Sequence, residues 1–356
     1  MEMIKNLQIN NYKSIGQIDL NCSRINVLIG EPNVGKSNIL EALDLSYLSW
    51  MLGANEGNEK AGKQIINIKE FFRVDKVADL FYLGDISKTI SILNDGFTSK
   101  TELNFVRESD NGSLPKNLKN IFAWSPGHSG IPTYFDNDFI PVENAQYYST
   151  PIKPYIYKDN IEFHDIGNYI NRLMPPYGNN LLEVIKYNAD FGAFIGELIQ
   201  DFDLEINSDI SIHKLWIQKR VNAGLVYSLP YNALADTLKR IIFYTAAIRH
   251  NNGTVITLEE PDAHSFPKFV SFLADEIIAN KKNQFFIATH SPYLLNNLIE
   301  NTPADELGIF VCGYDKIKGT TIKKLSGEDL SELLDYGVDI FFNINRYLDD
   351  RVNYSS

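Results

Sequence analysis

The sequence predicts an α/β fold built on a parallel sheet, and three observations predict it. The β-branched apolar run at residues 25–29 leads into a glycine-rich loop and then into a helical pattern that begins near residue 38. Two later apolar runs, 254–258 and 284–288, are continuous, as expected for strands covered on both faces. All three runs end in polar, chemically able side chains, and ligands of open α/β sheets collect at the carboxyl ends of strands. We therefore expect one site at this edge of the sheet.

The loop after the first run matches the pattern G-x-x-x-x-G-K-[ST], with the sequence Gly30-Glu31-Pro32-Asn33-Val34-Gly35-Lys36-Ser37. Its glycines let the backbone curl so that successive N–H groups point inward, toward a bound phosphate. The helix that follows adds the positive end of its dipole, and Lys36 adds a full charge. An ordinary strand-to-helix turn is the alternative, but such a match arises by chance in only about one chain in a hundred of this length. We expect phosphate to be held by Gly30, Pro32, Asn33, Val34, Gly35, Lys36, Ser37 and Asn38.

The first half of the chain has strand patterns on both sides of this loop and its helix. The helix extends to about residue 50, and a polar mobile loop is expected at 52–64. The stretch 108–160 is rich in Gly, Pro, Asn and Tyr, which predicts irregular structure with one strand at 154–158. The other expected strands are 3–10, 16–20, 89–95 and 100–107.

The second half contains both helical and strand patterns. Asn222-Ala223-Gly224 predicts a hairpin turn between two strands. Helix 328–336 is expected to begin with a capping box of Ser326 and Asp329 and to stop at Gly337. The remaining expected elements are helices 164–174, 180–201 and 235–249 and strands 211–219, 225–229, 307–312 and 319–325.

The composition is that of a folded protein from a reducing compartment. With 356 residues the chain can hold one elaborated domain or two, and its net charge of −12 speaks against a broadly basic nucleic-acid binder, although a local basic groove stays open. Cys22 and Cys312 lie far apart and give no zinc-ligand spacing. Neither a signal sequence nor an apolar run of membrane-spanning length is apparent, so we expect a soluble cytoplasmic protein without a membrane partner.

Phosphoryl transfer depends on positioning and charge, and the three strand ends supply the groups that it needs. Lys36 would bridge the β- and γ-phosphates, while the Ser37 hydroxyl and, through water, Glu259 would hold Mg²⁺. Glu260 would orient and deprotonate the attacking water, and His290 would contact the γ-phosphate. The alternatives are an exposed acidic turn after the strand and a core or capping histidine. ATP with Mg²⁺ is the expected ligand, because no Asn-Lys-x-Asp motif that reads guanine is apparent.

Four motifs, in the same order along the chain, resemble those of the RecF, SMC and OLD group of ATPases, which belongs to the ABC class of phosphate-loop ATPases. The motifs are Asn11-Tyr12-Lys13-Ser14-Ile15, Gly30 to Leu40, Glu259-Glu260-Pro261-Asp262-Ala263-His264 and Ala288-Thr289-His290-Ser291-Pro292. The chain looks most like the stand-alone, OLD-type bacterial ATP-binding proteins of the AAA kind that lack a TOPRIM nuclease domain. The residues after His290 read as the end of the ATPase lobe, so any nuclease chemistry would reside in another protein.

This resemblance implies a two-lobed head like those of ABC and SMC proteins, with a globular insertion of strands and helices in place of a coiled coil. Residues 1–50 would begin the head, 51–225 would form the inserted lobe, and 226–356 would complete the head. Two heads would sandwich two ATP molecules in a homodimer. The resemblance also places Lys13 and Ser14 near the phosphates, and a plain turn between strands is the alternative.

The chain departs from the family pattern where a signature motif of the Ser-Gly-Gly or Ser-Gly-Thr type is expected. It has Leu234-Ala235-Asp236-Thr237 there, and an acid beside the partner's γ-phosphate would repel it. Asp236 would instead cap its own helix, which leaves Thr237 and backbone N–H groups to face the phosphate. Two further departures are Glu259, where many phosphate-loop ATPases have Asp, and Ser265-Phe266-Pro267, where the family often has Leu-His-Pro.

We therefore expect an ATP-binding and ATP-hydrolysing protein that dimerises on ATP and regulates a separate effector, a nuclease or a toxin, in phage defence or a toxin–antitoxin-like module. A RecF-like repair ATPase that binds DNA directly is one alternative, and it predicts salt-sensitive binding. A scaffold that binds ATP without hydrolysing it is another, because Asp236 alters the signature. A transporter subunit is disfavoured, since the signature is altered and no glutamine loop is recognisable after the first helix.

Overall fold

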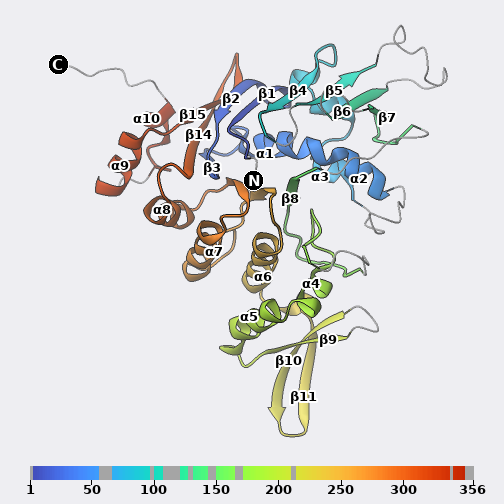
Figure 1. The fold of residues 1–356 in the computed structure, drawn as a ribbon, viewed down its shortest axis with the longest axis vertical. Helices are drawn as coiled ribbons and strands as arrows, with labels where there is room; N and C mark the ends of the chain where they lie inside the picture. Colours follow the sequence, from blue (N-terminus) through green and yellow to red (C-terminus); the bar gives the residue numbers. More distant parts are fainter. Residues whose placement is uncertain are drawn as a thin grey trace.

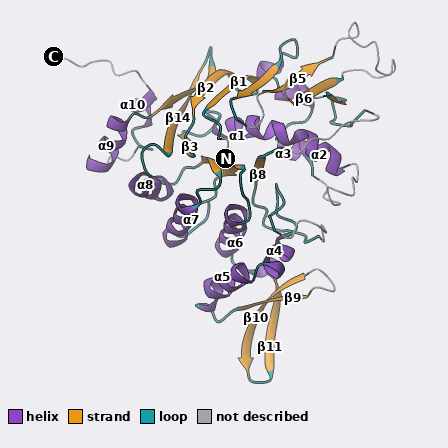
Figure 2. Ribbon diagram, viewed as in Figure 1, coloured by secondary structure: helices purple, strands orange, loops and turns teal. Residues whose placement is uncertain are grey.

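A large mixed sheet organises this protein, whose computed structural model is shown in Figure 1 and Figure 2. Among the described residues, twelve strands form this sheet in the order β7-β6-β5-β4-β1-β2-β15-β14-β3-β13-β12-β8, and three more form a small separate sheet. The α/β fold class predicted from the sequence is therefore confirmed. The structure describes residues 3–55, 66–96, 100–106, 121–126, 131–142, 150–164, 171–209, 214–336 and 340–348.

Five neighbouring strands at one end of the sheet run parallel, and they include the three strands whose ends were expected to carry the site. They are β8 (Ile152–Tyr155), β12 (Val255–Glu259), β13 (Gln284–Ala288), β3 (Ile25–Gly30) and β14 (Leu307–Asp315). In β3, the side chains of Ile25, Val27 and Ile29 belong to one hydrophobic core, and Leu28 belongs to a second core on the opposite face. Burial on both faces explains the continuous apolar runs of the sequence.

The other seven described strands of this sheet pair antiparallel. They are β15 (Gly319–Lys324), β2 (Ile15–Asn21), β1 (Asn6–Tyr12), β4 (Ile90–Asn94), β5 (Lys100–Phe105), β6 (Phe122–Pro126) and β7 (Thr133–Phe135). In β4, buried and half-buried side chains alternate, as in a sheet that covers a core mainly on one face. The five strands expected before residue 108, β3 among them, are confirmed, whereas β6 and β7 lie in the stretch that was expected to be irregular.

Helices cover both faces of the parallel strands (Figure 1). One core takes up side chains of α1 (Lys36–Asp44) and α2 (Leu48–Asn55). The core on the other face contains side chains of α6 (Asp236–Arg249), α7 (Pro267–Ala279) and α8 (Pro292–Asn301). The remaining described helices are α3 (Ile68–Phe71), α4 (Leu181–Tyr187), α5 (Ala189–Gln200), α9 (Gly327–Tyr336) and α10 (Ile344–Leu348), with 3₁₀ turns at Leu45–Tyr47, Val77–Leu80, Tyr82–Gly84 and Tyr231–Ala233.

A smaller unit projects from the α6 side of the sheet (Figure 1). It consists of α4, α5 and the sheet made of β9 (Glu205–Asp209), β10 (Lys214–Asn222) and β11 (Leu225–Pro230). Leu215 and Ile217 of β10 join the same core as α6, so the unit packs onto the helices that cover the large sheet. The hairpin turn predicted between β10 and β11 is confirmed.

Several expected elements differ from the structure. Residues 171–174 are not helical, so the helix expected there is wrong, and 165–170 lie outside the described residues. The backbone there bonds to a side chain instead, because the Asn180 amide accepts from Met174 N at 2.7 Å and donates to the carbonyl oxygen of Arg172 at 2.9 Å. The strand expected at 154–158 is β8, which ends at Tyr155. Helix α2 continues to Asn55, into the loop expected at 52–64, and the rest of that loop lies outside the described residues.

Helices α7 and α8 were not expected, although their first turns carry recognisable signals. Pro267 and Pro292 lie in the first turn of each helix, where the missing N–H of proline has no cost. The side chain of Ser291 caps α8 by accepting a hydrogen bond from Leu294 N. In the described part of the chain, no helix combines the length and the apolar character needed to cross a membrane.

The capping box predicted before α9 is confirmed. The Asp329 carboxylate accepts a hydrogen bond from Ser326 N at 2.8 Å, and Ser326 Oγ accepts one from Asp329 N at 3.2 Å. Gly337, the expected stop, lies outside the described residues. The division of the chain at residues 50 and 225 stays a prediction, and strands from all three parts share the large sheet.

Candidate active site

The phosphate-loop motif connects β3 to α1, and its geometry requires its glycines. Gly35 precedes the helix in a left-handed conformation (φ 102°), which residues with a Cβ rarely adopt. A Cβ at Gly35 would also lie 2.1 Å from Thr320 Oγ1. A Cβ at Gly30 would lie 2.6 Å from the carbonyl oxygen of Cys312, on the adjacent strand β14. Strands β14 and β15 therefore pack directly against the loop.

Replacing Gly35 with alanine is expected to lower the free energy of unfolding by about 2 to 4 kcal/mol and to weaken nucleotide binding. Gly253→Ala is the matched control, because Gly253 also has a positive φ, of 69°, but nothing lies within 4 Å of an added Cβ. The left-handed conformation alone costs about 1 to 2 kcal/mol. Urea unfolding of both variants measures the difference, and equal losses would contradict the close packing of Thr320 on the loop.

The side chain of Lys36 folds back over the loop and is buried. Its ammonium group donates hydrogen bonds to the carbonyl oxygens of Gly30, at 2.9 Å, and Glu31, at 2.8 Å. Burial lowers the pKa of Lys36, and the nearby carboxylates of Glu259 and Glu260 partly offset that shift. An anionic phosphate at this position would stabilise the charged ammonium further, in keeping with the role expected of Lys36.

Three strand ends that are distant in the sequence meet around one cavity of about 440 Å³. From the sites expected in the sequence, the cavity is lined by Pro32, Asn33, Gly35, Lys36, Ser37, Asn38, Glu259, Glu260 and His290. Gly30 and Val34 do not line it, because both residues are buried. The structure thus brings together the loop, the acidic pair and the histidine, while their roles toward a nucleotide stay predictions.

At this cavity the hydroxyl of Ser37 donates a hydrogen bond to the carboxylate of Glu259. Arg73 Nη1 also donates to Glu259 Oε1, at 3.0 Å. Hydroxyl and carboxylate oxygens suit Mg²⁺, which usually takes one or two carboxylates together with phosphates and waters. The described residues contain no group of three or more His, Cys, Asp or Glu side chains that could hold a metal by themselves. Ser37 and Glu259 therefore fit a metal ion that binds together with a nucleotide.

Glu260 and His290 follow the ends of β12 and β13, and Glu260 Oε1 lies 3.7 Å from His290 Nε2. Glu260 has a left-handed backbone (φ 44°), which is uncommon for a residue with a long side chain. Burial and the charge of Lys36 lower the pKa of His290, while Glu260 acts in the opposite direction. This shift favours the neutral form of the imidazole, and a neutral imidazole beside a carboxylate is suited to proton transfer.

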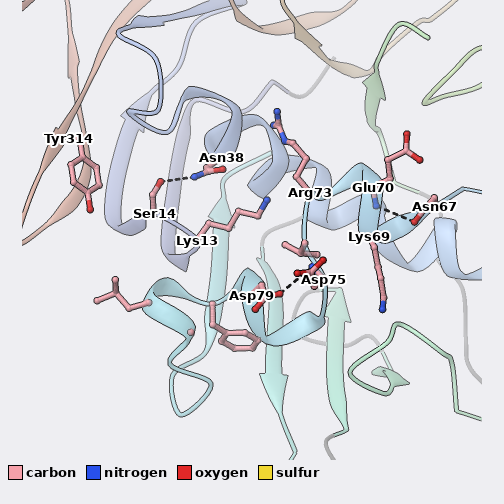
Figure 3. Close-up of a pocket in the computed structure, with 14 residues that line it drawn as sticks. Lys13, Ser14, Asn38, Asn67, Lys69, Glu70, Arg73, Asp75, Asp79 and Tyr314 are labelled. Atoms are coloured by element: carbon pink, nitrogen blue, oxygen red, sulfur yellow. Dashed lines mark hydrogen bonds between the residues drawn. The ribbon is translucent and has the colours of Figure 1, made fainter. Parts of the chain in front are cut away.

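Lys13 and Ser14 line a second, larger cavity of about 1030 Å³ (Figure 3). Asn38 and Arg73 line both cavities, so the two cavities adjoin. Ser14 Oγ accepts a hydrogen bond from Asn38 Nδ2 at 2.7 Å and is hydrogen-bonded to Thr320 Oγ1 at 2.7 Å. These two residues thus lie beside the phosphate loop, behind Asn38, and contact with phosphate stays a prediction for both.

Sequence reasoning missed Glu41 and Arg73, which form an ion pair beside the two cavities. Glu41 is buried in α1 and accepts hydrogen bonds from Lys13 Nζ, from Arg73 Nε at 2.7 Å and from Tyr12 Oη at 3.3 Å. Helical spacing could have indicated Glu41, because it follows Ser37 by four residues. No local pattern marks Arg73, which follows α3 and meets Glu41 and Glu259 only in the folded chain.

Replacing Glu41 with glutamine is expected to lower the free energy of unfolding by about 2 to 3 kcal/mol, because the largely buried ammonium of Lys13 would lose the carboxylate that offsets its desolvation. Asp138→Asn is the control, since it breaks the exposed Lys69–Asp138 pair and should cost less than about 1 kcal/mol. Urea unfolding measures both values. A loss for Glu41→Gln as small as that for the control would show that the buried cluster contributes no stability.

Asp236 does not cap its helix, so that expectation is wrong. It is the first residue of α6, after Ala235, and no side chain caps this helix. Its carboxylate instead accepts hydrogen bonds from Tyr157 Oη at 2.7 Å and Arg240 Nε at 2.8 Å. Burial alone would raise the pKa of Asp236, but these two bonds keep it below its usual value. The neighbouring Thr237 donates to the carbonyl oxygen of His264 at 2.8 Å, which joins α6 to the loop after β12.

Comparison with known proteins gives a family match that spans the site. Residues 25–296 match the family described as "AAA domain, putative AbiEii toxin, Type IV TA system". This range includes the phosphate loop, the acidic pair and His290. The "Uncharacterized protein MJECL10" of Methanocaldococcus jannaschii is 30% identical over 154 residues, which make up 40% of this chain and 68% of that protein.

Solved structures of SMC heads are similar to this chain at low sequence identity. The SmcHead bound to the C-winged helix domain of ScpA is 16% identical, with a TM-score of 0.49 over 91% of this chain and 98% of that one. The Smc head from Pyrococcus furiosus, bound to the C-terminal domain of ScpA, is 13% identical, with a TM-score of 0.47 over 94% and 99%. The SMC head domain from Thermotoga maritima is 13% identical, with a TM-score of 0.42 over 92% and 100%.

Proposed function

The chain belongs to the AAA domain family that its residues 25–296 match, and we propose that it is an ATP-hydrolysing head of the OLD, RecF and SMC type. The observation that carries the proposal is the cavity in which the phosphate loop, the acidic pair and His290 meet. Groups that bind phosphate, ligate Mg²⁺ and accept a proton all line this one space, which is the set that phosphoryl transfer needs.

ATP would bind with its β- and γ-phosphates against the loop, where backbone N–H groups at the start of α1 and the Lys36 ammonium donate hydrogen bonds. Ser37 and Glu259 would hold Mg²⁺, which neutralises charge on the phosphates when bound. Arg73 would then exchange Glu259 for another partner, because it occupies the same carboxylate oxygen. The larger cavity beside Asn38 has room for the nucleoside.

Hydrolysis would use Glu260 as the general base and His290 as a hydrogen-bond donor to the γ-phosphate. Glu260 accepts a proton from the water that attacks the γ-phosphorus, and the bond between this phosphorus and the β–γ bridging oxygen breaks. The imidazole of His290 lies 3.7 Å from the Glu260 carboxylate, which supports a joint role of the two groups at one phosphate.

The finer proposal is a homodimer that sandwiches ATP and regulates a separate nuclease or toxin. The family description names a toxin and a type IV toxin–antitoxin system, which supports a defence or toxin–antitoxin role. Arg240 and Tyr157 bind the Asp236 carboxylate, so its charge is balanced within the protomer instead of facing the partner's phosphate. That balance favours a hydrolysing protein over a scaffold that only binds ATP.

Direct DNA binding, as in a RecF-like protein, receives less support from the charges. On the hairpin, Lys219 lies 3.9 Å from Asp203, and Arg220 lies 4.0 Å from Glu205. On α6, the two basic side chains near the start of the helix pair with acids as well. Acidic neighbours at these distances reduce the positive potential that a phosphate backbone would require.

Phosphate release with Mg²⁺ and ATP, together with the mass in solution by light scattering, tests this function. We expect metal-dependent turnover and a mass of two chains with ATP but of one chain with ADP. Binding without turnover would favour the scaffold, and no nucleotide binding would overturn the proposal. Capture of the tagged chain from native cells then seeks the effector, and salt-sensitive DNA retention without a protein partner would favour the RecF-like alternative.

A further inference from the structure

Asp262 and Thr289, which have no role in the proposed reaction, join the loops that carry Glu260 and His290. Thr289 is completely buried at the end of β13, and its hydroxyl donates a hydrogen bond to Asp262 Oδ1 at 2.7 Å. The same hydroxyl oxygen accepts a hydrogen bond from Ser291 N at 2.9 Å. Thr289 thus fixes the backbone on the far side of His290 and ties it to the loop after β12.

The backbone of these loops adds to the connection. Thr289 N donates to the carbonyl oxygen of Leu28 in β3 at 3.2 Å, and Glu260 N donates to the carbonyl oxygen of Ala288 at 2.9 Å. Within its own loop, Asp262 lies two residues after Glu260, and its carbonyl oxygen accepts from Ser265 N at 3.1 Å. Backbone bonds thus fix the loop of Glu260 to β13 and the loop of His290 to β3. The Asp262–Thr289 bond then joins the two loops to each other.

The connection between the two loops maintains an unusual backbone conformation at Glu260. A left-handed backbone is unfavourable at a glutamate and persists only where the surrounding contacts determine it. In this conformation the Glu260 carboxylate lies 3.7 Å from the His290 imidazole. Release of the Asp262–Thr289 bond would let the loop relax toward an ordinary conformation and separate the two groups.

We propose that Asp262 and Thr289 are positioning residues, which hold Glu260 and His290 in the relative placement required for hydrolysis. This inference rests on the proposed ATPase function. It assigns the two residues no contact with nucleotide or metal, so their loss should reduce turnover and leave ATP affinity intact. Misplacement of reacting groups by about 1 Å costs on the order of 100-fold in rate, which sets the scale of the effect.

The test compares Thr289→Val, Asp262→Ala and the double variant with Thr257→Val as the matched control. Thr257 is also a buried threonine on an adjacent strand whose hydroxyl donates to an aspartate, Asp44, at 2.8 Å. Its bond anchors α1 to β12 and does not touch the loops after the strands. Thr289→Ser keeps the hydroxyl and serves as the rescue variant.

We expect Thr289→Val and Asp262→Ala to lower kcat about 10- to 100-fold, with the Kd for ATP within about twofold of the parent chain. The double variant should be no slower than the slower single variant, because both changes break the same bond. Thr289→Ser should recover most of the rate, and Thr257→Val should turn over normally. Equal rates in Thr289→Val and Thr257→Val, or a loss of ATP affinity that matches the loss of rate, would overturn the inference.

A spectroscopic signal separates this inference from the proposed function. The His290 ring resonance in a proton–carbon NMR spectrum, assigned with His290→Gln, should shift in Thr289→Val and Asp262→Ala but not in Thr257→Val. If the parent chain shows no turnover, the proposed function fails and this signal alone decides the inference. A shift in both variants then shows that the Asp262–Thr289 bond sets the placement of His290, and an unmoved signal overturns that part of the inference.

Discussion

Lys36→Ala is expected to abolish ATP binding at ATP concentrations that saturate the parent chain. The ammonium group would make charge-assisted hydrogen bonds to two phosphates, each worth about 1.5 to 3 kcal/mol, so their loss weakens binding about 100-fold or more. Calorimetric titration with ATP and Mg²⁺ measures this loss. Lys268→Ala removes an exposed lysine of α7 that lines neither cavity, and it should bind ATP normally.

The stability of the Lys36→Ala variant to urea is a second readout of this prediction. Burial lowers the pKa of Lys36, so the charged side chain is held at a cost in the absence of nucleotide. The variant should therefore be no less stable to urea than the parent chain when no nucleotide is present. ATP should stabilise the parent chain and leave the variant unchanged. Unchanged ATP affinity in Lys36→Ala would remove the central assignment of this site.

Glu260→Gln is expected to keep ATP binding and to reduce turnover by about 10²- to 10⁴-fold, the usual contribution of a general base. Glutamine has nearly the same shape as glutamate, so the left-handed backbone and the packing of the loop should persist. The variant should therefore accumulate an ATP-bound dimer, which light scattering detects as a mass of two chains. Glu300→Gln, at the exposed end of α8, is the matched control and should behave like the parent chain.

Two results would count against this role of Glu260. Full turnover in Glu260→Gln would exclude Glu260 as the base. His290, which lies 3.7 Å away, would then be the candidate base. Loss of ATP binding would show instead that the carboxylate belongs to the binding set. Both outcomes are read from the same pair of measurements, turnover and affinity.

Sequence reasoning succeeded where the physical signal is local. The strand β3, the glycine loop and α1 form a continuous stretch whose conformation depends on nearest neighbours, above all on Gly35. The continuous apolar runs of β12 and β13 follow from burial on both faces, which any such strand shows. The rule that parallel strands present their carboxyl ends to one edge then brings Glu260 and His290 to the loop.

It failed where the signal depends on the folded chain. Arg73 reaches Glu259 from a loop that no periodicity marks, and Thr320 contacts the phosphate loop from a strand almost 300 residues away in the sequence. The helix expected at 164–174 came from periodicity, whereas the backbone of Arg172 and Met174 bonds to the Asn180 side chain in the folded chain. Asp236 was expected to cap its helix, but its partners, Tyr157 and Arg240, are provided by tertiary contact and by the next helical turn.

A crystal structure of the chain with Mg²⁺ and a non-hydrolysable ATP analogue tests most directly whether three distant stretches serve one nucleotide. We expect the terminal phosphate within hydrogen-bonding distance of Lys36 Nζ and the metal ion between Ser37 and Glu259. The Glu260 carboxylate and the His290 ring should face that phosphate, and Arg73 should have left Glu259. A nucleotide bound elsewhere, or one bound to the loop with Glu260 and His290 turned away from its phosphates, would contradict the proposed site.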